Sequence, residues 1–325
     1  MKKPPKLNLF SRPTPVEKLS IDGVEIFVKK DDETGLLFSG NKVRKLEYLL
    51  KDALDKGHNS VITCGGVQSN HTRATTYLAV KLGLRPFVIA RGEPVLPPQG
   101  NFFLNLLLGA RFKFITREQF KNVEHHMEEW RKELLKEGYN PYIVPEGGSN
   151  ALGAWGYVDA MGELKEVIER EQIEALYFAT GSGGTGAGLL IGKEFHNVNI
   201  KLVGVLVVDT IEYFTNKINK IVEDFEKLYD LRVDARAQEI EFLDSFIGKG
   251  YAIPYPEEIE TISRIAKYGI ILDPVYTGKA FYGMLQHIKD KGYRRVMFLH
   301  TGGIFSIFAF NEYFQHEAEG LLQKQ

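Results

Sequence analysis

Short apolar runs alternate along the chain with longer segments in which apolar residues recur every three or four positions. The first run, Val24–Lys29, follows an Asp22-Gly23 turn signal and predicts a strand. From Lys42 to Lys56 the apolar side chains fall on one side of a helix, which Gly57 ends. Further strands are expected at 60–63, 86–90, 111–115, 142–144, 176–179, 201–208 and 295–299, with helices between most of them, including one from 118 to 137. This alternation predicts an α/β fold with mostly parallel sheets covered on both faces.

Composition narrows the classes of function. Hydrophobic residues make up 44% of the 325 residues and charged residues 26%, which is typical of a globular protein. The net charge of -1 favours neither nucleic acid nor an anionic membrane as a partner. The single cysteine, Cys64, excludes an intrachain disulfide and is expected to be buried and inert. No segment resembles a signal peptide or a membrane helix of about 20 apolar residues, so a cytoplasmic location is expected.

A glycine-rich loop, Thr180–Gly188, follows the strand expected at 176–179 and opens a helix. Ligands of parallel sheets bind beyond the carboxyl ends of the strands, and glycines let the backbone approach an anion closely. Gly181, Gly183 and Gly186 also satisfy the G-x-G-x-x-G pattern of dinucleotide-binding proteins, with Asp209 after the next strand. From this loop alone, pyridoxal 5'-phosphate (PLP) and a nicotinamide cofactor remain open.

Two further loops carry candidate chemistry. Lys42 follows Gly40-Asn41 at the start of a helix, where the helix dipole disfavours its positive charge. A lysine with a lowered pKa is what a Schiff-base enzyme needs, although Lys45, one turn further on, competes for the role. The loop Gly65–Thr72 places Ser69 and Asn70 at another helix start, where they either bind a carboxylate or cap the helix. His71 is expected to act as neither base nor ligand, and no metal site is predicted.

Four motifs taken together resemble one enzyme family. They are Ser39–Tyr48, Gly65–Asn70, Asp273–Tyr276 and His300–Gly303. In this order they are similar to the motifs of 1-aminocyclopropane-1-carboxylate (ACC) deaminases and D-cysteine desulfhydrases, over nearly the whole chain. The resemblance implies a PLP enzyme of the tryptophan-synthase-β-like fold (fold type II), with three-layer, open twisted sheets, usually a homodimer. It favours PLP over the nicotinamide oxidoreductase that the glycine pattern alone also allows.

The same resemblance implies where the cofactor would lie. A larger PLP-binding domain is expected from residues 1–47 and 158–325, a smaller α/β domain from 48–157, and the cofactor between them. Lys42 would hold the cofactor covalently and later transfer protons. Asn70 would lie against the ring and its phenolic oxygen. The phosphate would be held by the glycine loop, at Gly181, Ser182, Gly183, Gly184 and Thr185.

The resemblance also implies the substrate side of the site. Gln68 and Ser69, with Asn70, would receive the substrate carboxylate, and Ser69 would also act in catalysis. Tyr276 would face the substrate and act in catalysis, as would Tyr251 from the less exact motif Gly250–Pro254. A binding or regulatory protein that kept the fold and lost turnover is a further class that the sequence leaves open.

Two positions separate the possible substrates. ACC deaminases carry glutamate after the tyrosine of the third motif and leucine in the fourth, whereas this chain has Thr277 and Thr301 at these cofactor-facing positions. A carboxylate at the pyridine nitrogen keeps the nitrogen protonated and strengthens the electron sink, which cyclopropane opening should require. A thiol leaves more easily. The sequence therefore favours a lyase that eliminates sulfide from D-cysteine, with ACC deaminase, a hydrolase, as the alternative.

Overall fold

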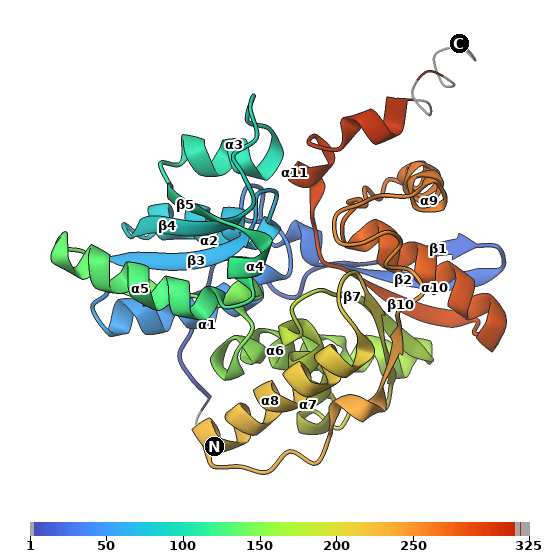
Figure 1. The fold of residues 1–325 in the computed structure, drawn as a ribbon. Helices are drawn as coiled ribbons and strands as arrows, with labels where there is room; N and C mark the ends of the chain where they lie inside the picture. The colour runs from blue at the N-terminus through green and yellow to red at the C-terminus, as the bar shows by residue number, and fades with distance from the viewer. Residues whose placement is uncertain (1–2, 316–318, 320–325) are drawn as a thin grey trace.

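The computed structural model describes residues 3–315 and 319, and it contains two sheets (Figure 1). The larger sheet has the strand order β1-β2-β10-β7-β8-β9, and the smaller has β5-β4-β3-β6. Only the β1–β2 pair is antiparallel. The strands are β1 (Val16–Ile21), β2 (Val24–Lys30), β3 (Ser60–Gly66), β4 (Arg85–Arg91), β5 (Arg111–Ile115), β6 (Pro141–Ile143), β7 (Ala175–Thr180), β8 (Lys201–Leu206), β9 (Ile240–Leu243) and β10 (Arg295–His300). The predicted α/β fold with mostly parallel sheets is confirmed.

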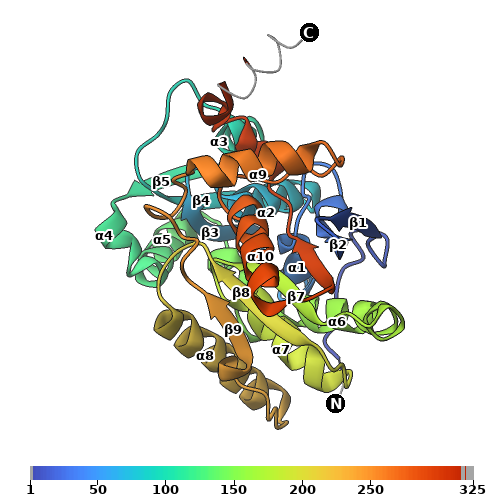
Figure 2. The same ribbon diagram turned by 90° about the vertical axis from the view of Figure 1, so that its right-hand side faces the viewer.

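Helices cover both faces of each sheet (Figures 1 and 2). They are α1 (Lys42–Asp55), α2 (Asn70–Lys81), α3 (Gly100–Leu107), α4 (Arg117–Phe120), α5 (Val123–Lys136), α6 (Ala151–Glu171), α7 (Gly184–Phe195), α8 (Ile211–Tyr229), α9 (Pro256–Ala266), α10 (Thr277–Lys291) and α11 (Ile304–Ile307). The larger sheet packs on α6, α7 and α8 on one face and on α9 and α10 on the other. Because both faces are covered, these strands read as continuous apolar runs.

The prediction of one continuous helix from 118 to 137 is wrong. The structure has α4 and then α5, separated at Lys121 and Asn122. Thr116 and Gln119 form a capping box that starts α4, while the backbone of Asn122 leaves the helical region. None of the helices described in 3–315 is long and apolar enough to cross a membrane.

The two-domain division remains a prediction, but the sheets divide in the expected way. All four strands of the smaller sheet lie within 48–157, and all six of the larger lie outside it. The two connecting helices cross the expected boundaries. Leu46 of α1 packs in the core of the smaller sheet, and Trp155 of α6 packs in the core of the larger.

A buried ion-pair network around Arg44 holds α1 against the larger sheet. The Arg44 guanidinium donates to both carboxylate oxygens of Asp31, which follows β2, at 2.7 and 2.8 Å. It also donates to both oxygens of Glu163 on α6, each at 2.9 Å. Burial by itself raises the pKa of Asp31, but the Arg44 charge and hydrogen bonds outweigh it and hold that pKa below its ordinary value. The side chain of Arg44, two positions after Lys42, therefore joins α1 to the segment after β2 and to α6.

Replacing Arg44 tests how much the fold depends on this network. Arg44→Met should lower the free energy of unfolding of the apoprotein by about 3–5 kcal/mol, because it leaves the fully buried carboxylate of Asp31 without its paired cation and removes one partner of Glu163. Urea denaturation followed by circular dichroism measures the change. Lys220→Met is the control, since it breaks the exposed pair with Asp224 and should leave the unfolding midpoint unchanged. An equal midpoint for the two variants would show that the network is dispensable.

Candidate active site

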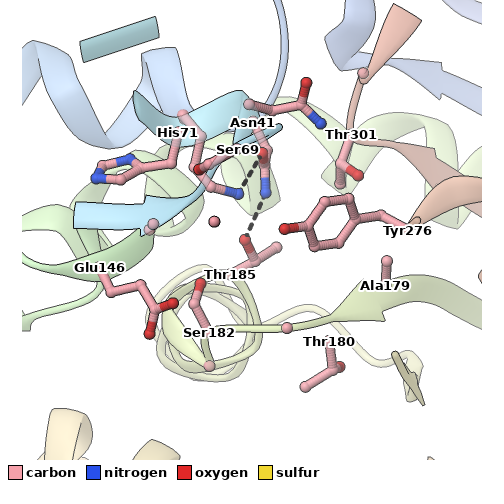
Figure 3. Close-up of a pocket in the computed structure, with 18 of the residues that line it drawn as sticks. Asn41, Ser69, His71, Glu146, Ala179, Thr180, Ser182, Thr185, Tyr276 and Thr301 are labelled. Atoms are coloured by element: carbon pink, nitrogen blue, oxygen red, sulfur yellow. Dashed lines mark hydrogen bonds between the residues drawn. The ribbon is translucent and has the colours of Figure 1, made fainter. Parts of the chain in front are cut away.

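A cavity of about 40 Å³ lies beyond the carboxyl ends of the strands, between the two sheets (Figure 3). Loops from both sheets line it, so residues far apart in the sequence meet there. The residues that line it are Asn41, Lys42, Gly65, Gly66, Ser69, Asn70, His71, Glu146, Gly147, Ala179, Thr180, Gly181, Ser182, Gly183, Thr185, Gly186, Tyr251, Tyr276, Thr301 and Gly302. The structure thus brings most of the predicted site residues together, as expected for a parallel α/β sheet.

Lys42 is the first residue of α1 and lines this cavity. Its ammonium donates to Asn41 Oδ1 at 2.9 Å, and Asn41 Nδ2 donates to Thr185 Oγ1 at 3.1 Å. Enclosure by protein lowers the pKa of Lys42 to about 8, although the carboxylates of Asp273 and Glu146 oppose the shift. A substantial fraction of this amine is therefore neutral and nucleophilic near pH 8.

Lys45, the competing lysine, has a different environment. Its side chain is fully buried, and its ammonium donates to the carbonyl oxygen of Gly147 at 3.2 Å. Burial and the nearby charge of Lys42 also lower its pKa, yet Lys45 is absent from the cavity lining. The geometry favours Lys42 as the lysine that reacts with a ligand in the cavity.

The glycine-rich loop forms the anion-binding side of the cavity. Gly181, Ser182, Gly183 and Thr185 line the cavity at the start of α7, where backbone N–H groups have no partner within the helix. Gly184 does not line the cavity, because its N–H donates to Ser149 Oγ at 3.3 Å. Free amides and the positive end of the helix dipole fit a phosphate group, and Lys42 lies at the same cavity.

The start of α2 forms another part of the lining. Ser69 caps α2 by accepting from the N–H of Thr72, and Asn70 is the first helical residue. Gln68, predicted to bind the substrate carboxylate, does not line the cavity. Its side chain instead accepts from the N–H of Asn101 at 2.9 Å and donates to the carbonyl of Gln99 at 3.0 Å, which ties the loop to α3. Of the three residues predicted to bind the substrate carboxylate, Ser69 and Asn70 therefore line the cavity.

Two tyrosines, Tyr251 and Tyr276, form a further part of the cavity lining. The hydroxyls of Tyr251 and Tyr276 are 2.5 Å apart, and a Cβ added to Gly181 would lie 3.0 Å from the Tyr276 ring. Thr301 also lines the cavity. Thr277 does not, because its hydroxyl donates to Asp273 Oδ1 at 2.8 Å and accepts from the Asp273 N–H at 2.7 Å. Thr277 thus closes the turn that carries Tyr276.

Several lining residues were not among the predicted site residues, and three of them carry an amide, imidazole or carboxylate side chain. Asn41 bridges Lys42 and Thr185, and Glu146 places a carboxylate near Ser182 (Figure 3). His71, expected to take no part, also lines the cavity, with its Nε2 2.7 Å from Thr63 Oγ1. Burial lowers the pKa of His71 well below its ordinary value, so the imidazole is neutral at pH 7. Asn41 and His71 stand beside predicted residues, but the sequence carries no signal for the direction of their side chains.

A wider cavity of about 600 Å³ adjoins the first one. The two share Glu146, Gly181, Tyr251 and Tyr276, which therefore form the passage between them. The outer cavity is lined by the cations Arg91, Arg117, Lys121, Lys217 and Lys249 and by the acids Glu124, Glu146 and Asp209. The outer cavity offers a route by which a small charged molecule reaches Lys42.

The chain belongs to the family described as pyridoxal-phosphate dependent enzymes, whose profile matches residues 7–302. Its cofactor is therefore PLP, which agrees with the anion-binding loop and the reactive lysine and decides against the nicotinamide alternative.

More particularly, it is an enzyme of the ACC deaminase and D-cysteine desulfhydrase family. A Thermotoga maritima protein named "Putative 1-aminocyclopropane-1-carboxylate deaminase" is 44% identical over 94% of this chain and 98% of its own length. The Arabidopsis thaliana "Bifunctional D-cysteine desulfhydrase/1-aminocyclopropane-1-carboxylate deaminase, mitochondrial" is 35% identical over 93% of this chain and 79% of its own length. A solved structure titled as that of an ACC deaminase homologue superposes with a TM-score of 0.88 at 37% identity, covering 95% of both chains. The predicted fold type II is confirmed.

The lowered pKa of Lys42 predicts how fast PLP attaches to the apoprotein. Only the neutral amine is nucleophilic, so the rate should rise with pH through a midpoint near 8. Stopped-flow absorbance between pH 6.5 and 9.5 measures this. Lys45→Met should keep the same midpoint, whereas Lys42→Met should form no covalent adduct. A midpoint near the ordinary lysine value of about 10.4 would contradict the environment described for Lys42.

Proposed function

We propose that this enzyme eliminates sulfide from D-cysteine and gives pyruvate and ammonia. The observation that carries the proposal is the set of groups around the cavity. A lysine amine with a pKa of about 8 faces an anion-binding helix start, the carboxylate-binding start of α2 and a pair of tyrosine hydroxyls. Each group has a place in the breakdown of an amino acid, because this reaction needs a base, a carboxylate anchor and a proton donor.

The roles follow from position. Bound PLP supplies an electron sink that stabilises negative charge at the substrate α-carbon. Lys42 takes up the α-proton, for which an amine with a pKa near the working pH is suited. Ser69 and Asn70 orient the substrate carboxylate at the positive end of α2. The paired hydroxyls of Tyr251 and Tyr276, which line the same cavity, face the substrate and supply a proton donor.

The choice of D-cysteine rests on the lack of an acid in the cavity lining on the side of Thr301. Among the described lining residues Glu146 is the one acid, and it lies on the Ser182 side, away from Thr301 (Figure 3). Asp273 is buried, and its carboxylate accepts from the N–H groups of Val275 and Thr277. Without a carboxylate among the groups lining that side, the pyridine nitrogen of bound PLP would stay largely unprotonated and the electron sink would be modest. A modest sink suffices for expelling a thiol, whereas opening a cyclopropane demands more.

The structure also changes which of the two threonines, Thr277 or Thr301, can separate D-cysteine from ACC as the substrate. Because Thr277 hydrogen-bonds Asp273, Thr277→Glu would bury a second carboxylate against an existing one. Thr301 is the residue of the two that reaches the cavity, so it is the better position for testing specificity. ACC deamination is the second candidate, and the names given to the relatives support it. The homodimer and the cytoplasmic location remain predictions.

A direct comparison of substrates tests the proposal. Wild-type enzyme should have a kcat/KM for D-cysteine about 100-fold or more above that for ACC, because that ratio measures differential stabilisation of the two transition states. Sulfide and pyruvate assays measure the first reaction, and 2-oxobutyrate release measures the second. Thr301→Leu should narrow the ratio by making the pocket apolar, and Thr301→Ser, which keeps the hydroxyl, should preserve it. A wild-type preference for ACC would refute the substrate assignment.

A further inference from the structure

Arg91 occupies the junction between the outer cavity and the Lys42 cavity. It is the last residue of β4, and a Cβ added to Gly66, which lines the inner cavity, would lie 3.7 Å from Arg91 Nη2. The same point lies 3.7 Å from the Tyr251 ring. The guanidinium is therefore beside the passage through which a molecule enters or leaves.

Aromatic rings hold this guanidinium without neutralising it. Its central carbon lies 4.8 Å from the centre of the Tyr251 ring and 5.0 Å from that of the Phe120 ring. No carboxylate in the described part of the chain forms an ion pair with Arg91. Ring faces attract a cation but carry no net charge, so the full positive charge remains available to an anion.

The other cations of the outer cavity are placed differently. Lys217 donates to the hydroxyl of Tyr213 at 3.0 Å, and its stem packs beside Gly183 of the anion-binding loop. Lys121 pairs with Glu118 at 2.7 Å. Lys217 likewise forms no ion pair with a described residue, but its amine is held by the Tyr213 hydroxyl, whereas the Arg91 guanidinium lies at the junction against Tyr251, which is itself held in place. Lys279 donates to the carbonyls of Ile247 and Gly250, at 2.7 and 2.9 Å, just before Tyr251 in the chain.

We propose that Arg91 stabilises the negative charge on the group that leaves the substrate β-carbon. This role rests on the β-elimination proposed above. The α-proton passes to Lys42, the electrons of that C–H bond form the α,β double bond, and the β-carbon–sulfur bond breaks. Sulfur departs with the bonding pair as hydrosulfide, and water then converts the released aminoacrylate to pyruvate and ammonia. The charge that develops on sulfur is opposed by the guanidinium at the exit.

Leaving-group dependence tests this role. With D-cysteine, Arg91→Met should lower kcat about 100-fold, the loss typical of removing one electrostatic stabiliser of a transition state. With β-chloro-D-alanine the loss should stay below about 5-fold, because chloride leaves readily and needs little stabilisation. Arg91→Lys should recover part of the D-cysteine rate. Lys113→Met, on the adjacent strand β5, removes a surface charge and is the matched control that should change neither rate.

The readouts separate the ways in which the proposal can fail. An equal loss on both substrates in Arg91→Met, with the absorbance of bound cofactor retained, would overturn the leaving-group role and leave β-elimination standing. Wild-type enzyme that releases neither sulfide nor chloride would overturn the proposed function, and the role of Arg91 with it. A large loss confined to D-cysteine, partly restored by lysine, is the result that the proposal expects.

Discussion

The position of Lys42 depends on one buried interaction. The Arg44 guanidinium forms bidentate ion pairs with the carboxylates of Asp31 and Glu163. The guanidinium and Asp31 are wholly buried, so each charge needs the others to offset the cost of leaving water. Because Asp31 follows β2 and Glu163 lies on α6, α1 has one position in which all these bonds form. That position puts the first residue of α1, Lys42, at the carboxyl edge of the larger sheet, while the apolar side of α1 packs against the smaller one.

Electrostatics at this edge follow from the same arrangement. Besides α1, the helices α2 and α7 begin at the cavity, so their N-terminal N–H groups and positive dipole ends favour anions there. The same enclosure disfavours the ammonium form of Lys42 and leaves its amine reactive. An amino acid and a phosphate-bearing cofactor both carry anionic groups, and each helix start offers one of them a site. The fold therefore prepares the binding of anions and the reactivity of the lysine together.

Much of this could be predicted from the sequence, because it depends on local patterns. Periodicity and spacing within short segments indicate the alternation of strands and helices. They also indicate the glycine loop around Ser182 and the lysine at the start of a helix. What the sequence did not reveal depends on tertiary contacts. Gln68 turns to α3 and Thr277 turns to Asp273, and neither direction follows from a motif. Glu146 and Arg91 reach the site from loops and strand ends of the smaller sheet, where only the fold brings them near Tyr251.

The measurement that tests the central claim most directly is the site of covalent attachment of PLP. Holoenzyme is reduced with borohydride, digested and mapped by mass spectrometry. The account predicts that the pyridoxyl group is found on Lys42, the lysine that lines the cavity beside Asn41 and Thr185. Label on Lys45 would contradict it, because that amine is buried against Gly147 and would have to leave its hydrogen bond to react.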